Sequence, residues 1–191
     1  MREVGRVVKL QVQTGPLKRG PNREWFDPAN LLAVSELEIT DRGVVGWLNS
    51  EAVQDVHHQD YPFNQGHKGH NLSFNVPSHY EQMRLRYGEH LWLGCGGDNV
   101  VFAAATPITL TDLQGEWVLE THRGERGRVV NVTIATPCLA FSHFVLNQPA
   151  PDPAQLKATL QFLSGGQRGF YADWQGPPLH LHPGDRLLAI S

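Results

Sequence analysis

The sequence has few cysteines, little net charge and no long apolar run, and each shortage excludes a class of protein. Two cysteines are a poor disulfide framework and are typical of a reducing cytoplasm. The formal net charge of -3 is spread along the chain and predicts no nucleic-acid partner. The longest apolar stretch, Val100 to Leu110, is shorter than the roughly 20 residues of a membrane-spanning helix, and Met1 to Leu10 lacks the apolar core of a signal peptide. We therefore expect a soluble cytoplasmic protein without a membrane partner.

Three common enzyme signatures are also missing from the sequence. It contains no Gly-x-Ser-x-Gly elbow, no phosphate-binding Gly-Lys-Ser/Thr run and no Gly-x-Gly-x-x-Gly dinucleotide fingerprint. Hydrolase, nucleotidase and dehydrogenase functions therefore have no basis in the sequence. The 191 residues are 40% hydrophobic, which is enough apolar material for one domain spanning 1–191.

The apolar residues that are present follow mainly a period of two, which is typical of strands. Val8, Leu10 and Val12 alternate with polar residues, 37–40 and 44–45 flank a turn, and the alternation returns at 130–134 and 187–190. Two segments predict helices instead: one starts at a capping box of Ser78 and Glu81, and the other starts at Asp152-Pro153. The pattern predicts a mostly β fold of the α+β class, with a closed or curled β-barrel and a few helices outside.

Cys138 is the most promising candidate for chemistry. It follows an alternating strand directly after Pro137, where proline ends the strand ladder and turns the thiol out at the end of the strand. The alternative is an ordinary buried cysteine that acts as a small hydrophobe, and the spacing alone does not decide between the two.

Two polar clusters are weaker candidates. Glycines surround Cys95 in the run 93–99, where successive amides can face an anion, although glycine-rich turns mostly serve conformation. A second cluster consists of four histidines that lie close together in the sequence, namely His57, His58, His67 and His70. Their loop contains no cysteine, which is unusual for a zinc site. The alternatives for this loop are a solvated segment or a rim that binds an anionic group.

Three blocks in order resemble the MOSC domain, the module named after the C-terminal part of molybdenum cofactor sulfurase. The first contains Asn71 to Phe74 and the Gly96-Gly97-Asp98-Asn99 turn, the second is Pro137-Cys138, and the third runs from Arg168-Gly169-Phe170 to Pro183-Gly184-Asp185. The resemblance covers about 37–190. The chain departs from the family pattern at Gly46-Trp47 and Gly115-Glu116, where the family usually has Gly-Asp.

The resemblance implies a barrel of the pyruvate-kinase β-barrel type and a functional thiolate at Cys138. It implies that Cys138 is the molybdenum ligand of an enzyme that uses the molybdenum cofactor to reduce small N-hydroxylated compounds. Such an enzyme would have a separate reductase as its partner. The alternatives are a sulfur carrier, which accepts sulfur at Cys138 from a cysteine desulfurase that uses pyridoxal phosphate (PLP), and a degenerate barrel without chemistry. The cofactor-binding residues that it implies for molybdopterin are Lys68, His70, Gly97, Asp98, Asn99 and Arg168. Trp47, His57 and His67 are expected to shape the substrate pocket.

Overall fold

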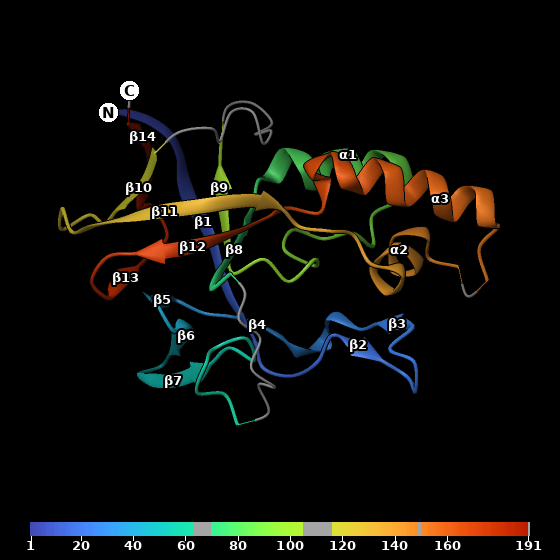
Figure 1. Cartoon of the computed structure of the whole chain (residues 1–191), viewed down its shortest axis with the longest axis horizontal. Coiled ribbons are helices and arrows are strands. Elements are labelled where there is room, and N and C mark those ends of the chain that lie inside the picture. Colours follow the sequence, from blue (N-terminus) through green and yellow to red (C-terminus); the bar gives the residue numbers. More distant parts are fainter. Residues whose placement is uncertain (63–69, 105–115, 149, 191) are drawn as a thin grey trace.

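A computed structural model describes residues 1–62, 70–104, 116–148 and 150–190, and these fold mainly as strands (Figure 1). Seven strands hydrogen-bond in a closed ring in the order β14–β10–β11–β12–β8–β9–β1, and β1 pairs again with β14. Among the pairings of the described strands, only that of β8 with β9 is parallel. The prediction of a mostly β fold with a closed barrel and a few helices is confirmed. The strands of this ring are β1 (Arg2–Gln13), β8 (Leu72–Asn75), β9 (Val100–Ala103), β10 (Glu116–Glu120), β11 (Arg126–Ile134), β12 (Phe170–Gln175) and β14 (Arg186–Ile190).

Smaller elements flank the barrel on two sides. A second sheet has the order β13–β5–β6–β7, β4 pairs with β1, and β2 and β3 form a separate two-stranded hairpin. The helices lie together at the other side in Figure 1. These elements are β2 (Lys18–Arg19), β3 (Trp25–Phe26), η1 (Pro28–Asn30), β4 (Leu31–Ala33), β5 (Glu36–Thr40), β6 (Gly43–Leu48), β7 (Glu51–Gln54), α1 (Pro77–Tyr87), α2 (Leu139–Leu146), α3 (Pro153–Phe162), η2 (Leu163–Gln167) and β13 (Leu179–Leu181).

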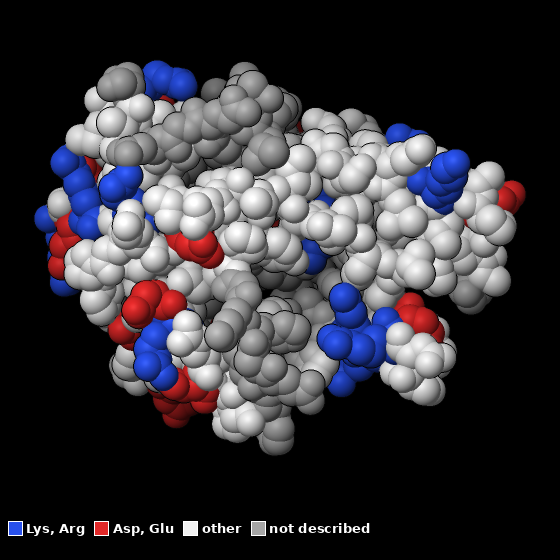
Figure 2. Space-filling view, in the orientation of Figure 1, with Lys and Arg blue, Asp and Glu red and all other residues white. Residues whose placement is uncertain are grey.

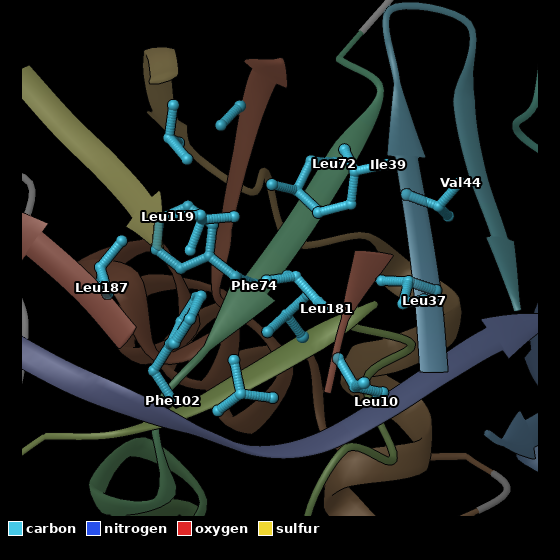
Figure 3. Packing of buried hydrophobic residues seen from close by; sticks show 14 of the residues in the cluster. Leu10, Leu37, Ile39, Val44, Leu72, Phe74, Phe102, Leu119, Leu181 and Leu187 are labelled. Carbon is cyan, nitrogen blue, oxygen red and sulfur yellow. The ribbon is translucent and has the colours of Figure 1, made fainter. Parts of the chain in front are cut away.

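One large apolar core fills the barrel and continues against the second sheet. In Figure 3, Phe74 and Phe102 from the barrel lie in the same cluster as Leu37 and Ile39 from β5. A smaller cluster lies beneath the helices and includes the fully buried Cys95. None of the described helices is long and apolar enough to cross a membrane.

Two local predictions differ from the structure, one is confirmed, and one helix was not predicted. The strand around Leu10 is present, but a register shift between Val7 and Lys9 turns Val7 inward and leaves Val8 44% exposed. The helix after residue 76 begins at Pro77 with Val76 as its N-cap, so the predicted capping box at Ser78 is wrong. The predicted helix start at Asp152-Pro153 is confirmed, and the Asp152 side chain caps the helix by accepting a hydrogen bond from the Ala154 amide. The sequence did not indicate α2.

Gly127 in β11 lies against the ring of Trp174, which is buried. A Cβ atom at residue 127 would lie 2.0 Å from two atoms of that ring. We expect Gly127→Ala to lower the free energy of unfolding by about 3 kcal/mol, because the core must shift to accept the methyl group. Urea unfolding measures this loss. If the clash is the cause, Trp174→Leu added to Gly127→Ala costs less than the sum of the two single changes, whereas full additivity would contradict this explanation.

Candidate functional site

A cavity of about 420 Å³ brings together residues that are far apart in the sequence. Its wall contains the described site residues that the sequence analysis singled out, namely Cys138, His70, Gly97, Asp98, Asn99 and Arg168. Lys68 and His67 lie outside the described residues. Figure 2 shows a hollow on this face beside the blue patch over β2 and β3.

Cys138 is the N-cap residue of α2 and is half-buried. Its backbone is extended, with φ -113° and ψ 157°, and its side chain makes no capping hydrogen bond. Its carbonyl instead accepts hydrogen bonds from the amide and hydroxyl of Ser142, both at 3.0 Å. The thiol therefore lies at the positive end of a helix, which favours a nearby negative charge.

Arg168 supplies a second positive charge on the same wall. Its side chain is 12% exposed, and its guanidinium lies 4.7 Å from the centre of the Phe141 ring. Burial alone lowers the pKa of Arg168, but attraction to Tyr171, Asp98, Tyr80 and Cys138 together raises it. The guanidinium therefore stays charged, and Cys138 is one of the groups that raise its pKa.

Asp98, on the same wall, holds this arginine in place. The carboxylate is 1% exposed, its Oδ1 lies 3.7 Å from Nη1 of Arg168, and its Oδ2 accepts hydrogen bonds from the Tyr80 hydroxyl and from Nδ2 of Asn75. Burial raises the pKa of Asp98, while Arg168 and the two donors partly offset that rise. Burial also raises the pKa of Tyr80 well above its usual value, so Tyr80 stays a neutral donor. Asp98 is thus a positioning residue.

The glycine turn serves conformation more than anion binding. The amide of Gly96 donates to the Tyr80 hydroxyl at 3.2 Å, that of Gly97 donates to the Gly94 carbonyl at 2.9 Å, and that of Asn99 donates to Oγ of Ser73 at 3.0 Å. These three amides are used inside the protein. Gly97 has φ +92°, which other residues rarely adopt. The side chains around the cavity are therefore better candidates than this turn for holding an anion.

Asp55 is a second buried carboxylate on the wall of the cavity, and no sequence pattern predicted it. Asp55 accepts hydrogen bonds from the amides of Gln13 and His57 and from Nδ2 of Asn99, at 2.8, 2.9 and 3.0 Å. Oδ1 of Asn99 accepts hydrogen bonds from Ser73. Asn99 therefore joins β8 to the loop after β7 and has little freedom to bind a ligand.

The histidine cluster does not act as one unit. His57 and His70 line the cavity, whereas His58 is buried and contacts Gln54 through Nδ1 at 2.9 Å. His70 lies 3.0 Å from the Asp173 carboxylate and stacks on Tyr171. Within the described part of the chain, these three histidines form no group spaced to bind a metal. Trp47 does not line the cavity.

Two cations on the β2–β3 hairpin complete the rim of the cavity. Lys18 is half-buried, Arg23 is exposed, and both line the opening. The prolines and glycines of 15–22 predict only a loop. The density of basic residues near this loop was the local signal for these two cations. The spacing, however, does not predict that they line the same cavity as Cys138.

The two cysteines differ in accessibility, which gives a direct test of the site. Cys95 is fully buried, and burial raises the pKa of its thiol to about 12. The reactive thiolate of Cys95 is therefore scarce at neutral pH. We expect iodoacetamide to add one label to the native protein, at Cys138, as measured by intact mass. The Cys138→Ala variant should take no label until it is unfolded, and rapid labelling of Cys95 in that folded variant would contradict the placement.

Comparison with known proteins gives structural relatives only. No family model matches the sequence, and no curated protein matches it. The crystal structure of the YuaD protein from Bacillus subtilis is similar, with a TM-score of 0.60 and 14% identity, over 98% of this chain and 96% of that one. The crystal structure of a hypothetical protein has a TM-score of 0.59 and 12% identity, over 99% of this chain and 70% of that one. The chain shares their fold. At these identities the likeness carries no function.

Proposed function

We propose that the chain is a MOSC-type protein that holds the molybdenum cofactor through the Cys138 thiolate and reduces small N-hydroxylated compounds. The observation that carries the proposal is a half-buried thiol at the start of α2, on the wall of a cavity of about 420 Å³ that also contains Arg168, whose side chain is 12% exposed. A thiolate is a soft ligand, and its sulfur is a donor that a molybdenum centre could accept from the protein.

The donor set of the cavity fits the cofactor. Cys138 offers the sulfur ligand, and Lys18 and Arg23 lie on the rim where they would hold the anionic phosphate of a pterin. Arg168 would balance negative charge near the thiolate. The volume lies within the usual range of a cofactor or ligand pocket.

The chain's own residues have limited and distinct tasks in such a reaction. The cofactor, when bound, supplies the two-electron redox chemistry. The overall change is R–NH–OH + 2 e⁻ + 2 H⁺ → R–NH₂ + H₂O, with electrons from a reductase partner. Cys138 anchors the cofactor, Arg168 stabilises negative charge beside it, and Asp98 orients Arg168. The imidazoles of His57 and His70 on the wall are the candidates to deliver protons to the leaving oxygen.

The hairpin cations give a prediction with a matched control. Arg23→Ala and Lys18→Ala should each weaken retention of the cofactor about tenfold, because each removes a charge from the rim that faces the phosphate. Arg19 lies on the same hairpin, pairs with Asp27 at 3.6 Å and does not line the cavity, so Arg19→Ala should have little effect. Equilibrium dialysis against a molybdopterin-carrier protein measures retention, and equal effects of all three changes would contradict the assignment.

Activity tests the proposal. Protein from a host that makes molybdenum cofactor should reduce a small N-hydroxylated amine with a chemical one-electron donor, consuming two electrons per amine formed. Protein that lacks both molybdenum and activity would overturn it. If Cys138 instead gains one sulfur atom after incubation with a PLP-dependent desulfurase and its substrate cysteine, the sulfur-carrier alternative is favoured.

A further inference from the structure

A second cluster of ligand side chains lies at the turns that join β10 to β11 and β13 to β14. His122 comes from the first turn, and His182 and Asp185 come from the second. The two turns meet because β10 pairs with β14, with Glu120 opposite Arg186. One ligand atom of each of the three residues lies within 4.8 Å of the other two. None of the three lines the Cys138 cavity.

The contacts of the His182 ring leave one of its nitrogens ready to bind a metal. Its Nε2 lies 3.3 Å from the Glu36 carboxylate, which favours the tautomer with the proton on Nε2. Its Nδ1 is buried and has no hydrogen-bond partner among the described residues. A buried nitrogen acceptor without a partner is costly, and a carboxylate on the far nitrogen is the usual support of a metal-binding imidazole.

Asp185 and His122 already have suitable spacing. The Asp185 carboxylate is held by the backbone amides of His122 at 2.8 Å and His182 at 2.7 Å. Its Oδ1 lies 3.3 Å from Nδ1 of His122. Two ligands of a tetrahedral zinc ion lie about 3.4 Å apart. The His122 side chain is 58% exposed, so small rotations remain open to it.

The surroundings leave room for a fourth ligand and do not repel a cation. A cavity of about 300 Å³ includes His122 and Asp185 in its wall, which leaves space for water. The two arginines on that wall each pair with a carboxylate, Arg6 with Glu3 and Arg186 with Glu120. The Asp185 charge therefore remains to attract the ion.

We propose that His122, His182 and Asp185 bind a zinc ion, with His182 ligating through Nδ1 and water filling the remaining position. Two imidazoles with one carboxylate are a donor set that zinc accepts. The ion would join the two turns at the closing strand of the barrel, at a site separate from Cys138.

Zinc binding to tag-free, chelator-treated protein tests this site, measured in the Cys138→Ala background so that the thiol does not contribute. We expect one ion per chain in competition with a coloured zinc chelator. His122→Ala should weaken binding at least about tenfold, and Glu36→Gln should weaken it about tenfold through loss of support for His182. His180 also contacts Glu36 but lies outside the cluster, so His180→Ala is the matched control and should change binding less than twofold.

Thermal unfolding gives a second readout that does not depend on the chelator. Zinc should raise the melting temperature of the parent protein and of His180→Ala, but not that of His122→Ala. Equal melting temperatures of the three proteins without zinc would show that the exposed His122 is not needed for folding. Absence of zinc binding, or equal weakening by His122→Ala and His180→Ala, would overturn the proposal.

Discussion

Replacing Arg168 by methionine is expected to lower the free energy of unfolding by about 3 kcal/mol at neutral pH. Methionine keeps most of the apolar contact with Phe141 but removes the charge beside Asp98, which is 1% exposed. The loss comes mainly from leaving the Asp98 carboxylate buried without a cation. The hydrogen bonds from Tyr80 and Asn75 remain and limit the effect.

The pH dependence of this loss identifies Asp98 as its cause. Burial raises the folded-state pKa of Asp98 above 3.8, so its contribution to stability is fully present below that value and declines as pH rises through the folded pKa. Arg168 lowers this folded pKa, so Arg168→Met raises it further. The loss of unfolding free energy in Arg168→Met should therefore become smaller as the pH falls and larger as the pH rises.

Urea unfolding at about pH 5 and about pH 8 measures the difference. Adding Asp98→Asn should restore part of the stability, because it removes the buried charge. A loss that is the same at both pH values, together with no rescue by Asp98→Asn, would show that Arg168 acts through packing alone.

The second large effect concerns catalysis. Cys138→Ala should reduce the turnover of an N-hydroxylated substrate by more than about 100-fold, to the level without enzyme, because the cofactor loses its protein ligand. Cys138→Ser keeps the size but offers a harder oxygen donor, so it should fail as well. Cys95→Ala removes the only other thiol, from the core beneath the helices, and should keep activity where the protein folds. Retained turnover in Cys138→Ala would contradict the role of the thiol.

Much of the fold followed from local patterns, while the departures have non-local causes. Alternation located the strand around Leu10 and a hairpin of 37–40 with 44–45, because each has one buried face. It missed the register shift at Val7, which depends on pairing with β9, a strand far along the chain. It missed α2 because 139–146 is apolar on most sides and shows no clear period. Ser78 matched a capping pattern, yet Pro77 already starts the helix.

The candidate site was only partly predictable for the same reason. The family resemblance selected Cys138 and Arg168, and the structure places both on one cavity wall. Asp55 and Arg23 lie on that wall too, but they reach it through the packing of the hairpin and the loop after β7, which no local pattern encodes. The roles of Asp98 and Asn99 as internal supports became visible only from their hydrogen bonds.

The molybdenum content of the purified protein tests the central claim most directly. Wild type, Cys138→Ala and Cys95→Ala are produced in the same host that makes molybdenum cofactor and are analysed by mass spectrometry for metal per chain. We predict molybdenum in wild type and Cys95→Ala and none in Cys138→Ala. Equal molybdenum in all three proteins, or its absence from wild type, would contradict the proposed role of Cys138.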